Sequence, residues 1–191
     1  MKKYILLALV FVASSVCAQQ IKVKSGKLDF LKGEETITVS YSYDDMEVGK
    51  LTEEEYLEKK KADVEKKGDS FEDWEAKWIS DRADRYQPKF EELFNDNVGA
   101  PQISDEGNYN MHVNTDFTEP GFNIGITRKN ASVSLTVVFT DKDGAEKAKV
   151  TVVNSSANSF LGTDFDAAYR IQESYAKAGR ELAKFIKKQL K

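Results

Sequence analysis

The residues best suited to chemistry or binding lie on one predicted strand in the middle of the chain. His112 is the only histidine, and it alternates with Asn110, Asn114 and Asp116 between apolar residues. Side chains two positions apart on a strand share a face, so these polar groups are expected to lie together. His112 and Asp116 are two metal-ligating types, fewer than a typical metal site needs, and the sequence has no Gly-x-Ser-x-Gly nucleophile turn for a triad. We therefore predict an exposed polar strand face, with no metal ion, no cofactor and no catalytic residue.

Two further predicted strands carry hydroxyl groups on one face. Thr38 belongs to a strand from Thr36 to Tyr43, and Thr136 to a strand from Ser132 to Thr140, each with apolar residues at the alternate positions. With Asn110, His112 and Asn114, Thr38 and Thr136 form our predicted surface for a peptide or glycan partner. The alternative is a solvated sheet face built from strand-favouring Ser and Thr.

Trp74 and Trp78 are the only tryptophans, and their spacing of four places both on one side of a predicted helix. Such a pair suits stacking against a sugar ring. The alternative interpretation is core packing, because aromatic side chains bury large areas and a helix must pack one face on something.

Two acidic patterns permit chemistry without requiring it. Asp141, Asp143 and Gly144 resemble the start of a calcium loop, but Thr151 and Val152 stand where its later Glu is wanted, and Asp with Gly is also what a hairpin turn requires. The carboxylates between Glu53 and Asp84 would allow a glycosidase-like pair. With 32 acidic residues in the chain, this does not discriminate between functions.

The C-terminal stretch from Thr163 to Lys191 is the clearest helix. Thr163 and Asp166 have the spacing of a capping box, and apolar residues then recur at steps of three and four. This stripe predicts one buried helix face, with Gly179 allowing close approach of the element packed against it.

A helical insertion is predicted at about 51–95. Thr52 with Glu55 and Ser70 with Asp73 mark two helix starts, Gly68 separates them, and Pro88 breaks the second helix or starts a short one.

The strands form hairpins in this interpretation. The stretch Ile21 to Phe30, with a change of phase at Ser25-Gly26, is expected to pair with Thr36 to Tyr43. The strands on either side of the Asp141 to Gly144 turn form a second hairpin. The fold class is α+β: a mainly antiparallel, or mixed, sheet of five to six strands, with the C-terminal helix and the tryptophan-bearing helix covering one face.

The N-terminal residues 1–18 have the pattern of a secretory signal. Lys2 and Lys3 precede a short apolar block, and small residues at Val16 and Ala18 predict cleavage before Gln19. Alternatively, Cys17 would be the acylated residue of a lipoprotein signal, but Ser14 and Val16 occupy places where Leu and a small residue are usual. Residues 19–191 are then expected to form one domain, exported to the periplasm or associated with the outer membrane, without a transmembrane span.

The charge of the chain argues against nucleic acid as a partner. The formal net charge is -4, and removal of Lys2 and Lys3 with the signal makes it -6. An acidic surface repels phosphate backbones.

Several sequence stretches resemble a family of envelope proteins. The signal ending Val-Cys-Ala-Gln-Gln is similar to that of exported proteins of Bacteroidetes-type Gram-negative bacteria. The later part of the chain resembles small envelope proteins of those bacteria. The resemblance lies in the run Glu119-Pro-Gly-Phe-Asn-Ile-Gly-Ile, a following hairpin, Gly162-Thr-Asp-Phe-Asp, Arg170-Ile and a long Ala/Lys helix. Their layout is similar to the N-terminal domain of TolB and to lipoprotein activators of penicillin-binding proteins.

This resemblance implies a role in binding other envelope components. Together with the export signal it leads us to expect a non-enzymatic binding or accessory protein that contacts an envelope protein or glycan. The alternatives are a carboxylate-based hydrolase and a small-ligand or glycan-binding module that uses Trp74 and Trp78.

Overall fold

The protein is an α+β fold built on one mixed sheet. A computed structural model describes residues 20–124, 127–156 and 166–191. Six strands follow one another across the sheet in the order β1 (Gln20–Gly26), β10 (Glu146–Ser155), β9 (Ser132–Asp141), β6 (Tyr109–Glu119), β2 (Thr36–Ser42) and β5 (Gln102–Ile103). β2 runs parallel to both β6 and β5, and the other neighbours are antiparallel.

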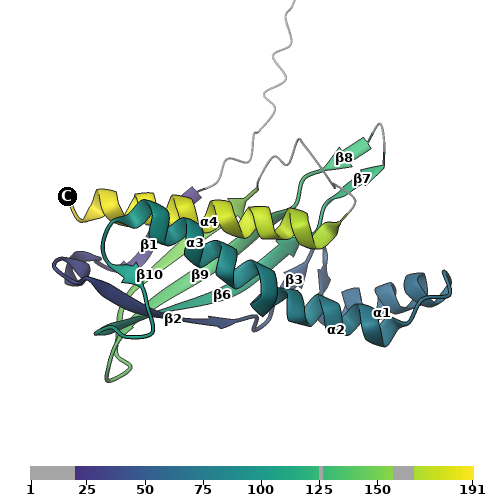
Figure 1. The fold of residues 1–191 in the computed structure, drawn as a ribbon, viewed down its shortest axis with the longest axis horizontal. Coiled ribbons are helices and arrows are strands. Elements are labelled where there is room, and N and C mark those ends of the chain that lie inside the picture. The colour runs from purple at the N-terminus through teal and green to yellow at the C-terminus, as the bar shows by residue number, and fades with distance from the viewer. Residues whose placement is uncertain (1–19, 125–126, 157–165) are drawn as a thin grey trace, which may run out of the picture.

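Short strands lie at one end of the sheet. β3 (Glu47–Val48) pairs with β6 beyond the end of β2 and with β4 (Leu51–Thr52). β7 (Phe122–Ile124) and β8 (Thr127–Lys129) form a separate two-stranded sheet. These elements lie at the same end of the molecule as the helical pair α1 (Glu53–Glu65) and α2 (Phe71–Asp81) (Figure 1).

Two helices cover one face of the sheet. α4 (Ala167–Gln189) lies across β9 and β10, and α3 (Gln87–Val98) lies beside α4 (Figure 1). Buried residues recur along α4 at helical spacing, as the sequence pattern predicts: Ala168, Ile171, Tyr175, Ala178, Leu182 and Ile186. They meet the apolar side chains that β6, β9 and β10 direct to the same side. The opposite face of the sheet has no helix of the described residues over it (Figure 1).

Gly179 allows the close approach that we expected, but toward α3 rather than toward the sheet. A Cβ atom at this position would lie 2.2 Å from the Phe90 carbonyl oxygen, well inside van der Waals contact. The two covering helices therefore pack backbone against backbone at this point.

The prediction that the tryptophan-bearing helix covers the sheet is wrong. That helix, α2 (Phe71–Asp81), pairs with α1 (Glu53–Glu65) and projects beyond the end of the sheet (Figure 1). The helix on the sheet is α3, which a π-helical turn (Arg82–Tyr86) joins directly to α2. Pro88 lies in the first turn of α3, where a proline costs no hydrogen bond, so it starts that helix.

The predicted pairing of the first two strands is also wrong. β1 ends at Gly26, which has a positive φ of 71°, and Leu28 and Phe30 belong to a turn and a 3-10 helix (Asp29–Leu31) instead of a continued strand. β1 then pairs with β10, while β2 lies four strands away beside β6. Alternation of apolar residues indicates a strand and its inner face, but it carries no information about the neighbouring strand. The second hairpin, β9 with β10, is confirmed.

The helix starts are largely as predicted. The Thr52 hydroxyl accepts from the Glu55 amide and the Glu55 carboxylate accepts from the Thr52 amide, which completes the predicted capping box. Ser70 caps α2 through the Asp73 amide. α4 begins later than predicted: Asp166 is itself the N-cap and accepts from the Ala168 amide, so it is not the third helical residue of a box. Thr163 lies outside the described residues.

Candidate functional site

Five of the predicted surface residues come together on the open face of the sheet. In the parallel pairing of β2 with β6, Thr38 lies opposite Asn110, Ser40 opposite His112 and Ser42 opposite Asn114. Asn114 in turn lies opposite Thr136 on β9. We name this group the polar ladder; its residues are Thr38, Ser40, Ser42, Asn110, His112, Asn114, Asp116 and Thr136.

Hydrogen bonds join the polar ladder along its length. The Thr38 hydroxyl donates to Asn110 Oδ1 at 3.1 Å, and Asn110 Nδ2 donates to the Ser40 hydroxyl at 3.0 Å. Ser40 Oγ lies 3.0 Å from His112 Nδ1, and Ser42 Oγ lies 2.9 Å from His112 Nε2. The ladder is thus ordered before any partner arrives, which lowers the entropy cost of binding.

The hydrogen bonds made by the neighbours of His112 determine which of its ring nitrogens carries the proton. Asn114 Nδ2 donates to the Asp44 carbonyl, so Asn114 Oδ1 is an acceptor, and the Ser42 hydroxyl donates to it at 2.7 Å. The Ser42 oxygen is then left to accept from His112 Nε2–H, and Nδ1 accepts from Ser40. The neutral ring with its proton on Nε2 fits every bond, and neither ring nitrogen is left for a metal ion.

Asp116 is held apart from His112. The register of β6 with β9 shifts between Thr115 and Phe117, so Asp116 is the extra residue of a bulge. Its carboxylate accepts from Thr136 Oγ1 at 2.7 Å and from Asn114 Nδ2 at 2.9 Å. Among the described residues, His112 and Asp116 are linked by hydrogen bonds through Ser42 and Asn114 and do not contact each other directly. This arrangement does not favour metal binding or direct proton transfer between them.

Trp74 and Trp78 lie in a different part of the molecule, between α1 and α2. Their rings stack on one another at 5.8 Å, and Tyr56 and Phe71 complete the cluster. Trp78 is buried, and its Nε1 donates to Glu53 at 2.6 Å. Trp74 is half-buried. The rings face each other, so they do not present two parallel flat faces to a ligand; the cluster joins the two projecting helices.

The most buried carboxylates of the helical region are occupied by basic partners. Asp81 lies 3.5 Å from Lys77 Nζ and 3.8 Å from Arg85 Nε. Glu53 accepts from Trp78 and from Arg82. The Asp141 carboxylate accepts from the Asp143 and Ala145 amides and so serves the turn. Within residues 20–124, 127–156 and 166–191, no three His, Cys, Asp or Glu side chains group in a way that could hold a metal ion.

Comparisons with known proteins give little support to any assignment. No family model matches the sequence, and no curated protein matches it. Two structures of the PelC dodecamer from Paraburkholderia phytofirmans, one of them a point variant, are similar to this chain with TM-scores of 0.38 and 0.39. Each is 12% identical and the alignment covers 84% of this chain and 97% of that chain. A likeness at this level establishes neither a shared fold nor a shared role.

Among the helices of the described residues, none combines the length and the apolar character needed to cross a membrane.

The sequence interpretation missed Lys60 and the basic side chains near it. Lys60 lies four residues after Tyr56 and four before Val64, on the inner side of α1, where its Nζ is 5.6 Å from the Tyr56 ring and 5.9 Å from the Trp74 ring. A lysine at an inward helix position was visible in the sequence as a break in the thin apolar face of this helix. Its surroundings are described below.

Proposed function

We propose that this chain is an exported, non-enzymatic binding protein of the Gram-negative envelope, which holds a protein partner on its polar ladder. The observation that carries the proposal is the position of the ladder: it spans three adjacent strands of the one sheet face over which no described helix lies. The N-terminal signal pattern supports export.

The chemistry of the ladder suits a polar, extended partner. Hydroxyl, amide and imidazole groups both donate and accept hydrogen bonds, so they match the amides of a peptide chain. Of the ladder residues, only Asp116 carries a full charge when His112 is neutral, so such a partner would be recognised by hydrogen bonds and shape more than by charge.

The test is capture from detergent-solubilised envelope with the exported form, Gln19 to Lys191, which contains every described residue. A double variant, Thr38→Arg with Thr136→Arg, places two long cations on the ladder. The matched control, Ala76→Arg with Ser80→Arg, adds the same charge at exposed positions of α2. Circular dichroism confirms that each variant is folded.

We expect a partner that the native chain and the α2 control retain and that the ladder variant loses. A partner held equally by all three proteins would place binding elsewhere. Hydrolysis of an envelope glycan, ester or peptide that disappears in His112→Ala would contradict the non-enzymatic role.

A further inference from the structure

A pocket of about 660 Å³ lies where α1, the β3–β4 turn and the start of α4 meet. Five basic side chains line it, together with one carboxylate; the basic ones are Lys50, Lys59, Lys60, Lys129 and Arg170. We name this the basic pocket. It is unusual for a chain with a formal charge of -4, and its volume is within the range of small-ligand sites.

Two of the five basic groups already have partners. Lys129 pairs with Glu119, whose other carboxylate oxygen accepts from the Gly121 amide at 3.1 Å. The buried Arg170 donates to the carbonyl oxygens of Pro120 and Gly121, each at 3.2 Å. These contacts fix one wall of the pocket and neutralise its only carboxylate.

Among the described residues, the positive charges of the other three lysines, Lys50, Lys59 and Lys60, are not paired in this way. In the described part of the chain, no carboxylate lies within ion-pair distance of Lys50, Lys59 or Lys60, although Asp63 is near enough to Lys60 to influence it. Lys60 is half-buried against the Tyr56 and Trp74 rings. Loss of hydration lowers the pKa of Lys60, Asp63 opposes that effect, and the neighbouring Lys67 and Lys59 add to it.

The start of α4 adds to the positive potential. Ala167, its first residue, lines the basic pocket, and no acidic residue lies in its first turn. A helix of 23 residues directs the positive end of its dipole to this point, and Arg85 pairs with the N-cap carboxylate of Asp166. The uncompensated lysines and the helix start, two separate features, favour an anion at the same place.

We propose that the basic pocket binds a small anionic ligand, with a phosphate or carboxylate group on Lys50, Lys59 and Lys60 and its carbon skeleton against Phe122. Phe122 lines the pocket and is 40% exposed, so it offers an apolar surface beside the cations. This site is separate from the polar ladder and does not depend on the proposed function.

The test is calorimetry, in which each probe is titrated into the protein. The protein is expressed with its own N-terminal segment and purified after export. The probes are glucose 6-phosphate, glucuronate and neutral glucose. A further arm uses phosphatidylcholine vesicles with and without phosphatidylglycerol, because the same oxyanion chemistry occurs on a lipid headgroup. Tryptophan fluorescence gives a second signal, since Lys60 Nζ lies over the Trp74 ring, 5.9 Å from its centroid.

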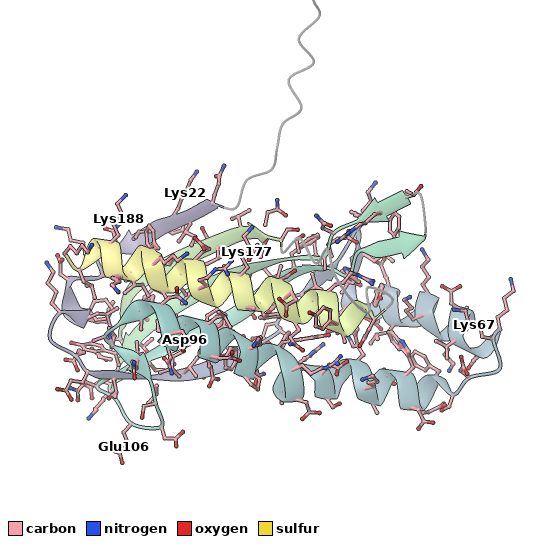
Figure 2. All side chains as sticks on the ribbon, turned by 45° about the horizontal axis from the view of Figure 1, so that its top comes forward. Lys22, Lys67, Asp96, Glu106, Lys177 and Lys188 are labelled. Carbon is pink, nitrogen blue, oxygen red and sulfur yellow. The ribbon has the colours of Figure 1, made fainter. Side chains whose placement is uncertain are left out.

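The variant protein carries Lys50→Gln, Lys59→Gln and Lys60→Gln. The charge-matched control carries Lys187→Gln, Lys188→Gln and Lys191→Gln. Lys188 lies at the opposite end of the molecule from Lys67, which is in the turn after α1 (Figure 2). We expect glucose 6-phosphate or glucuronate to bind and glucose not to bind. Affinity should fall at least about tenfold in the pocket variant and stay unchanged in the control.

Each other outcome is decisive. Binding to phosphatidylglycerol vesicles alone, with the same dependence on the three lysines, would assign the anion to a lipid headgroup and support the pocket. Failure of every anionic probe to bind, or an equal loss in the C-terminal control, would overturn the proposal. Thr38→Arg with Thr136→Arg should bind the anion normally, so failure of the ladder proposal is distinguishable from failure of this one.

Discussion

The two faces of the sheet are built from the same strands and have opposite environments. On β9, Val137 is completely buried under the helices, whereas its neighbour Thr136 is half-buried on the open face and bonded to Asp116. The covered face is stabilised by packing, and the open face by hydrogen bonds among its own side chains. The difference teaches that substitutions on the first face should change stability, while those on the second should change binding with little loss of stability.

The largest effect is expected from Gly179→Ala, where α4 meets α3 above the covered face. The new methyl group would overlap the Phe90 carbonyl, so α3 must move away and the core beneath it loosens. We expect a loss of about 3 kcal/mol in the free energy of unfolding, at the upper end for overpacking. Denaturant unfolding measures it, with Lys188→Ala on the exposed side of α4 as the control. A loss below that of the control would show that the helices are not in close contact.

A pair of reciprocal changes compares the two faces directly. Val137→Thr buries a hydroxyl among apolar neighbours and should cost about 2 kcal/mol. Thr136→Val removes only a partly exposed hydrogen bond to Asp116 and should cost about 0.5 kcal/mol. Equal losses for the two variants would mean that both faces are covered in solution.

A buried hydrogen bond on the covered side gives a smaller effect. Thr115 Oγ1 and the Tyr175 hydroxyl lie 2.6 Å apart, and both residues are buried. Tyr175→Phe leaves the threonine hydroxyl without this partner and should cost about 1.5 kcal/mol. Adding Thr115→Val should restore part of the loss in thermal unfolding. If the double variant loses more stability than the two single variants lose together, the hydrogen bond is not the reason for the effect.

The smallest change in stability is expected at the N-terminus of α4, where the Asp166 carboxylate lies 3.0 Å from Arg85 Nη1. Burial opposes ionisation of Asp166, but the hydrogen bonds from Arg85 and the Ala168 amide outweigh it and hold its pKa below the usual value. The stability it contributes is therefore present above the unfolded pKa, about 4, and is lost as the pH falls through the lower folded value. Asp166→Asn keeps the cap and should flatten this acid dependence in a pH series of thermal unfolding. An unchanged slope would show that the Arg85 pair contributes nothing.

Much of the local structure and part of the site were predictable. The alternation of Thr38, Asn110, His112, Asn114 and Thr136 with apolar residues placed all five on polar faces, because strand geometry has a period of two. Short polar signals also sufficed for the helix starts at Thr52 and Ser70, since these side chains bond amides within their own turn. The role of Ser40 and Ser42 as bridges to His112 was not predictable, because it depends on the parallel pairing of β2 with β6.

The sequence by itself determined most of the longer strands and helices and which side of each is apolar, since these follow from residues close together in the chain. Only the tertiary structure decided which strands are neighbours, that α3 and not α2 covers the sheet, and that Lys50, Lys59 and Lys60 share a pocket with the start of α4. The physical reason is that local propensity and periodicity act within a few residues, whereas strand order and pockets arise from burying distant apolar faces against one another.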